Sequence, residues 1–65
     1  MYNIGDKLEV ATKMLTHDIT LETKVMTVTE IYPHKGIDNK EFYMYSFDDN
    51  PYIHYPEKRI LRKVE

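Results

Sequence analysis

The chain has 65 residues, no cysteine and a formal net charge of −2, with 42% hydrophobic and 31% charged residues. A domain of this size buries only about 60% of the surface that its unfolded chain exposes, so a large catalytic cleft is not expected. The lack of cysteine excludes disulfides, thiolate metal sites and thiol nucleophiles, and the near-neutral charge balance argues against a general nucleic-acid binder.

The apolar stretches of the chain are short. None approaches the roughly 20 residues that a membrane-spanning helix requires, and charged residues interrupt the N-terminal segment where a signal peptide needs an apolar run. Val, Ile, Thr, Tyr and Phe nevertheless make up 24 of the 65 residues, a composition that favours strands and supplies a core. We therefore expect a soluble cytoplasmic all-β protein with one domain over residues 1–65.

The first predicted strand covers residues 7–14 and follows a turn at Gly5-Asp6. Its apolar side chains alternate with polar ones, which is the period of a half-buried strand. The side chains that share one face are Leu8, Val10, Thr12 and Met14. A helix is the alternative, because Asp6 and Glu9 have the spacing of a capping box. We favour the strand because a helix would leave Val10 off its apolar stripe.

A long extended stretch from Ile19 to Tyr32 follows a connection at residues 16–18. Its apolar side chains change parity: Ile19, Leu21 and Val25 share one face, and Met26, Val28 and Tyr32 share the other. A bulge or sharp bend between Thr23 and Met26 would explain this change and would let one strand serve two parts of a curled sheet. Residues 33–36, which include a proline and a glycine, are predicted to break the strand.

The second half of the chain predicts a hairpin followed by two short elements. In chain order we expect an exposed loop (36–40), a strand (41–47), a polar turn (48–51), a strand (52–55), a single 3-10 turn (56–59) and a last strand (60–64). The sequence leaves open which face of the 41–47 strand is buried, because aromatic residues occur on both.

Three segments carry a resemblance to a known fold. They are the glycine-containing entry Gly5-Asp6-Lys7-Leu8, the aromatic strand with its Asp-rich turn at 43–50, and the stretch from Tyr55 to Val64. This order resembles the SH3-like small barrels of the KOW and Tudor-like kind. The resemblance implies a small five-stranded SH3-like barrel with a one-turn 3-10 helix before the last strand. Residues 20–24 stand where a KOW-like segment usually has a glycine pair, so no family function is implied.

The sequence shows no catalytic constellation. The spacing of the three histidines matches no metal-binding template, and the adjacent carboxylates Asp48 and Asp49 fit a solvated turn better than paired acid–base groups. Ser46 is the only serine and lacks the setting of a nucleophile. We predict a protein that is not an enzyme and holds no metal or cofactor.

The aromatic content exceeds what so small a core can hide. Whichever face of the 41–47 strand is buried, aromatic or Met side chains remain on the other face, and exposed Tyr and Met near an Arg are typical of protein-binding surfaces. The competing interpretation is that these side chains only cover a thin core. The predicted partner-binding residues are Tyr32, His34, Phe42, Met44, Tyr52, His54 and Arg59.

These residues predict a non-catalytic binding module that regulates or inhibits another protein, of the kind that phages and mobile elements encode. Self-association through an edge strand or the aromatic face would also stabilise so thin a core. The alternative is an RNA- or DNA-binding module that uses a basic C-terminal cluster. That cluster consists of Lys58, Arg59, Arg62 and Lys63. The competing interpretation of this basic cluster is that its charges only protect an exposed strand edge against aggregation.

Overall fold

A computed structural model describes residues 2–64, which form an all-β fold with one 3-10 turn and no α-helix. The elements are β1 (Lys7–Thr16), β2 (Ile19–Lys35), β3 (Glu41–Phe47), β4 (His54–Pro56), η1 (Glu57–Arg59) and β5 (Ile60–Val64). The predicted order of strands and 3-10 turn is confirmed. The helical alternative for residues 7–14 is wrong, because β1 pairs along its length with β2 and in its first half with β5.

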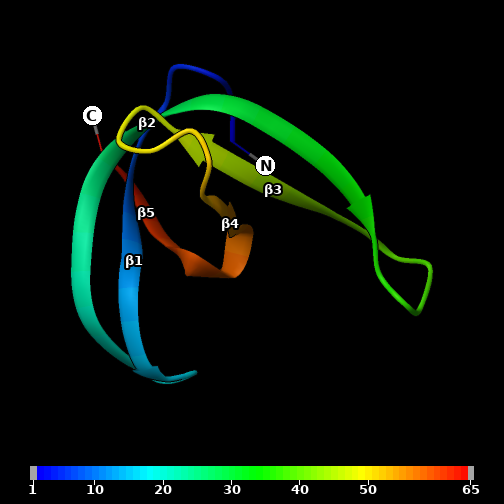
Figure 1. The fold of residues 1–65 in the computed structure, drawn as a ribbon, viewed down its shortest axis with the longest axis horizontal. Coiled ribbons are helices and arrows are strands. Elements are labelled where there is room, and N and C mark those ends of the chain that lie inside the picture. The colour runs from blue at the N-terminus through cyan, green and yellow to red at the C-terminus, as the bar shows by residue number, and fades with distance from the viewer. Residues whose placement is uncertain (1, 65) are drawn as a thin grey trace.

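The five strands form one antiparallel sheet in the order β4-β3-β2-β1-β5. The 17-residue β2 lies at its centre and pairs first with β1 and then with β3. In Figure 1 it arches across the molecule, and the two hairpins that it forms diverge from each other. The strands β4 and β5 are the two edges, and no pairing joins them within residues 2–64. The closed barrel implied by the resemblance is therefore not confirmed.

The core lies under the arch of β2, where alternate side chains of several strands meet. Its buried members are Leu8, Val10, Met26, Val28, Tyr45, Phe47 and Ile60. Tyr43 packs against this cluster from the same face of β3 as Tyr45 and Phe47. The structure thus decides the question that the sequence left open: these three aromatic residues face inward, and the alternate residues of β3 face away from the core.

The bulges in β2 do not lie where the sequence predicted one. Residues 23–27 pair in regular register with residues 7–11 of β1, so the predicted bulge between Thr23 and Met26 is wrong. The register shifts on either side instead, where Leu21 and Thr29 have no residue opposite them. Val25 is exposed because it lies opposite Glu9 and points away from the core, whereas the next residue, Met26, lies opposite the buried Leu8. Ile19 and Leu21 are exposed because they lie at the end of the β1–β2 hairpin, past the core.

The sequence predicted that Pro33 ends the strand, and this is wrong. β2 continues through Pro33 to Lys35. Pro33 stands opposite Tyr43 in the ladder with β3. Antiparallel pairs alternate between hydrogen-bonded and non-hydrogen-bonded. The Gly36 N–H donates to the Lys40 carbonyl at 3.0 Å, which makes Pro33 and Tyr43 a non-hydrogen-bonded pair by this alternation. The missing proline N–H therefore costs no bond, and a strand tolerates proline at such a position.

The predicted strand at 52–55 begins two residues late, since β4 starts at His54. The side chain of Asn50 accepts a hydrogen bond from the Tyr52 N–H at 3.0 Å, and its carbonyl accepts one from Ile53 at 3.3 Å. These bonds keep residues 50–53 in a turn, as asparagine commonly does.

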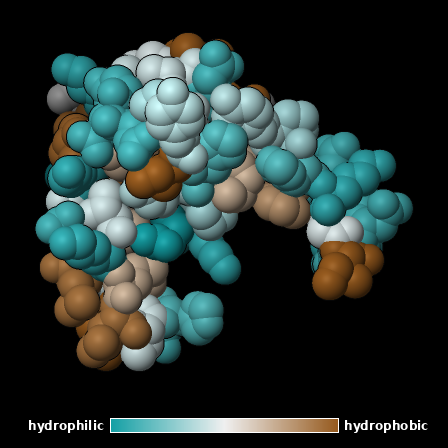
Figure 2. All heavy atoms as spheres, viewed as in Figure 1, coloured by the Kyte–Doolittle hydropathy of each residue, from teal (hydrophilic) through white to brown (hydrophobic). Residues whose placement is uncertain are grey.

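The two diverging hairpins leave a hollow between them on the face shown in Figure 2, and hydrophobic residues lie at the end of each. At the end of the β1–β2 hairpin, Leu15 and Leu21 are 66% and 62% exposed, and Ile37 is fully exposed in the β2–β3 loop. Residues 2–64 include no helix with the length and apolar character needed to cross a bilayer.

Candidate functional site

Five side chains gather on the face of β2, β3 and β4 that points away from the core. In the β2–β3 register Tyr32 stands opposite Met44 and His34 opposite Phe42, while β4 adds His54. Antiparallel partners point to the same side of a sheet, so these residues form one surface. We call it the aromatic-histidine face: Tyr32, His34, Phe42, Met44 and His54.

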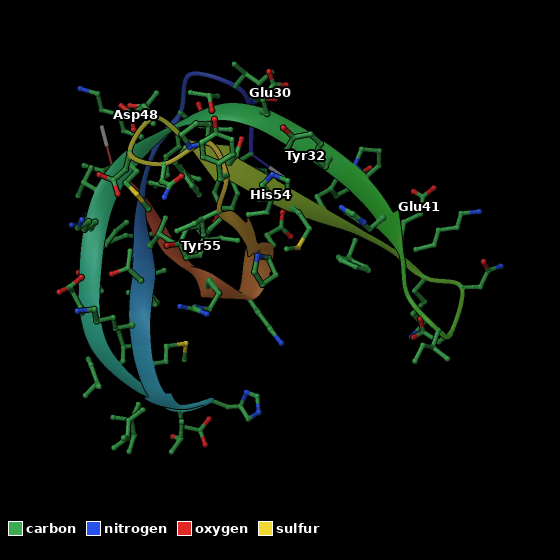
Figure 3. All side chains as sticks on the ribbon, viewed as in Figure 1. Glu30, Tyr32, Glu41, Asp48, His54 and Tyr55 are labelled. Carbon is green, nitrogen blue, oxygen red and sulfur yellow. The ribbon has the colours of Figure 1, made fainter. Side chains whose placement is uncertain are left out.

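The rings of this face stack in two pairs. Tyr32 and His54 lie with their centroids 4.5 Å apart at an interplanar angle of 20°, and Figure 3 labels both residues near β2. His34 and Phe42 are 5.4 Å apart at 17°. Phe42 is 42% exposed although it is a large apolar side chain. Each pair holds its rings in a defined orientation at the surface, where another molecule can contact them.

The alternation along β3 is the reason for this arrangement. The core takes Tyr43, Tyr45 and Phe47, so Phe42 and Met44 must point the other way. At the far end of the same face Ser46 is buried, and its hydroxyl lies 3.4 Å from that of Thr29. The exposed part of the surface is thus confined to the half of β3 near the β2–β3 loop.

Two of the seven predicted partner-binding residues lie elsewhere. Tyr52 is in the turn before β4 and is 91% exposed without a ring partner among the described residues. Arg59 is turned towards β1: its Nε donates a 2.8 Å hydrogen bond to the Ala11 carbonyl, and its guanidinium lies 5.5 Å from the centroid of the Tyr55 ring. Arg59 therefore connects η1 to the body of the fold.

Three of the four basic residues of the nucleic-acid alternative make contacts with different parts of the fold. Arg62 bonds to the Glu9 carboxylate at 2.8 Å, and Lys63 Nζ lies 3.5 Å from Asp6. Arg59 bonds to Ala11, as described above. A phosphate would have to compete with these contacts, and the alternative remains a prediction from the sequence.

A groove runs beside the aromatic-histidine face, between the first half of β3 and η1. Its volume is about 570 Å³, and sequence reasoning did not find it. The lining residues are Glu41, Phe42, Tyr43, Pro56, Glu57 and Lys58. It exists because the chain leaves the sheet after Pro56 and enters η1, which no local pattern indicates. Phe42 belongs to both the groove and the face.

The ionisable groups with shifted pKa values make hydrogen bonds within the fold. Burial, together with a 2.7 Å hydrogen bond to Glu57, raises the pKa of Tyr45 to about 12. A backbone hydrogen bond from Asn3 is the main cause that lowers the pKa of Asp6. Within residues 2–64 no three His, Asp or Glu side chains lie close enough together to hold a metal ion. The arrangement presents rings and a groove for contact with another molecule.

No known protein family, curated protein or solved structure matches the chain.

Proposed function

We propose that this protein is a non-catalytic binding module that docks on another protein through the aromatic-histidine face. The observation that supports it is the pair of ring stacks, Tyr32 with His54 and His34 with Phe42, on the side of the sheet that the core does not use. Rings with Met are enriched in the centres of protein interfaces, where they supply contact area at low cost in side-chain entropy.

We also propose that the fold is a relative of the SH3-like small barrels in an open form. Two features support this relation: a sheet of a long central strand and four further strands, and a 3-10 turn directly before the last strand. The hydrogen bond from Arg59 to the Ala11 carbonyl places η1 at the end of the β1–β5 pairing. In a closed barrel the strands would meet at this point. Function does not follow from that relation.

Site-specific photo-crosslinking in the native host tests the binding function. A benzoylphenylalanine is placed at Phe42, with the same residue at Leu61 of β5 as the control, because Leu61 is similarly exposed. We expect a crosslinked protein at position 42 and none at position 61. Equal crosslinking at both positions, or none at either, contradicts the proposal, and a product of two copies of this chain would identify self-association instead.

The purified partner then gives an affinity. Phe42→Ala and Met44→Ala should each weaken binding at least tenfold, as expected for residues at the centre of an interface. Leu61→Ala should leave the affinity unchanged. Circular dichroism of each variant verifies that the loss of binding does not come from loss of the fold.

A further inference from the structure

A second groove adjoins η1 and the end of the β1–β2 hairpin. Its volume is about 510 Å³. β5 pairs with β1 only as far as Val10, so no strand covers the last part of β1 on this side within residues 2–64. We call this hollow the basic groove, and its lining residues are Met14, Leu15, Thr16, His17, Lys58 and Arg59.

The charged side chains of the basic groove are both cationic. Arg59 is held in place by the hydrogen bond from its Nε to the Ala11 carbonyl at 2.8 Å. Lys58 is exposed and makes no ion pair in the part of the chain that the structure describes. No carboxylate is among the described lining residues, and Glu57, the acidic residue next to Lys58, is bonded to Tyr45. The groove therefore attracts anions.

The part of the groove that β1 supplies is mainly apolar. Met14 is half-buried, and Leu15 is 66% exposed. Asp18 lies in the hairpin turn that follows, but it is exposed and is not among the lining residues. An exposed leucine in one groove with two cations offers contact area to an apolar group and attraction to a carboxylate. Protein interfaces combine these two kinds of contact.

We propose that the basic groove binds a short segment of a partner protein in which an acidic residue stands next to a large apolar residue. The carboxylate contacts Lys58 and Arg59, and the apolar side chain covers Met14 and Leu15. This site is separate from the aromatic-histidine face and does not depend on the function proposed for that face. Lys58 also lines the groove beside β3, so the two sites are neighbours.

A nucleic-acid strand fits the basic groove less well than such a segment. Lys58 and Arg59 would attract its phosphates, but phosphates would leave the apolar wall uncovered. The other two residues of the basic C-terminal cluster, Arg62 and Lys63, form ion pairs elsewhere and do not line this groove. Two cations beside an apolar wall match one acidic residue and its apolar neighbour.

The test is an NMR titration of the isotope-labelled protein with an acetylated and amidated peptide in which aspartate and leucine alternate. We expect saturable shifts of the backbone amides at residues 14–17 and 58–59, and smaller shifts in β3. The absence of saturable shifts at these positions at millimolar peptide overturns the proposal.

Two altered peptides show which groups the groove selects. Asparagine in place of aspartate removes the charge, and serine in place of leucine removes the apolar contact. Each change should weaken binding at least tenfold, because the proposed site uses both groups. If the serine peptide binds as tightly as the original, the groove is a simple anion site and the proposal is wrong. Unchanged binding of the asparagine peptide contradicts it equally.

Three variants test the same groups on the protein. Lys58→Glu should weaken binding of the original peptide at least tenfold. Lys40→Glu, in the exposed β2–β3 loop, changes the net charge by the same amount and should leave the affinity within about twofold of wild type. Leu15→Thr should weaken binding several-fold through the lost apolar contact. Equal losses for the two lysine variants would show general electrostatic attraction instead of a site, and would overturn the proposal.

An oligonucleotide and the crosslinking experiment separate this proposal from the others. If single-stranded DNA binds more tightly than the peptide at the same salt concentration and shifts the same residues, the groove is a nucleic-acid site and the proposal is wrong. The photo-crosslinking at Phe42 reports on the aromatic-histidine face alone. The binding function of that face can therefore stand when the basic groove fails, and the reverse.

Discussion

Tyr45 Oη donates a 2.7 Å hydrogen bond to the carboxylate of Glu57. This bond connects the buried face of β3 to the first residue of η1. Tyr45 is fully buried in the core, and its hydroxyl also accepts a 3.3 Å bond from the Tyr2 N–H. This contact sets the direction in which the chain leaves β4. It therefore also sets one wall of the groove beside β3.

The first prediction concerns alkaline pH. The folded state raises the pKa of Tyr45 from 10.0 to about 12, so between these values it keeps a proton that the unfolded chain loses. The free energy of unfolding therefore falls as the pH rises from about 10 to about 12, and the full contribution is present below pH 10. Tyr45→Phe should lose about 1 kcal/mol at neutral pH and should show a flatter alkaline decline.

Urea unfolding at a series of pH values measures both effects. The difference between wild type and Tyr45→Phe isolates this hydroxyl from the other groups that titrate in the same range. Parallel curves for the two proteins above pH 10 would show that the Tyr45–Glu57 bond is not the cause.

The second prediction separates structural and binding roles at η1. Arg59→Ala removes the bond to the Ala11 carbonyl and the contact with the Tyr55 ring. It should lower the free energy of unfolding by about 1–2 kcal/mol. The neighbouring exposed Lys58→Ala is the control and should stay within about 0.5 kcal/mol of wild type. Equal stability of the two variants would contradict the structural role of Arg59.

The third prediction concerns acid. Hydrogen bonds from Asn3 to Asp6 and from Thr23 to Glu9 lower the pKa of both carboxyls, and Lys63 and Arg62 contribute in the same direction. A lowered folded-state pKa stabilises the protein above the ordinary values, 3.8 and 4.5, and this contribution is lost as the pH falls below them.

A variant with both Asp6→Asn and Glu9→Gln tests this dependence. Between about pH 5 and about pH 2 its free energy of unfolding should fall less steeply than that of the wild type. Thermal unfolding at each pH provides the measurement. The same slope in both proteins would mean that other carboxyls cause the acid sensitivity.

The fourth prediction concerns the end of the β1–β2 hairpin. Leu15→Thr and Leu21→Thr change exposed residues beyond the core, so each should stay within about 0.5 kcal/mol of wild type. Leu8→Thr, at a fully buried position, should cost more than about 2 kcal/mol. A large stability loss in either surface variant would place the hairpin end in contact with the core.

Local patterns in the sequence were enough to predict the strands β1, β3 and β5, the 3-10 turn before β5 and the long β2 that pairs with two other strands. These features depend on the alternation of side chains and on turn residues such as Pro56, which act over a few neighbours. The predicted bulge between Thr23 and Met26 and the predicted strand end at Pro33 were wrong, because bulges and the tolerance of a proline depend on which groups the neighbouring strand uses.

Five of the seven predicted partner-binding residues come together on one face, because they alternate with buried ones on β2 and β3 or stand beside them on β4. That this face of β3 is the exposed one depends on tertiary packing and could not be predicted. Tertiary packing also turned Arg59 towards Ala11 and took the chain out of the sheet after Pro56 into η1. Burial and edge pairing depend on which distant segments pack against a strand. The alternation of side chains along the strand is the same whichever of its two faces these segments cover.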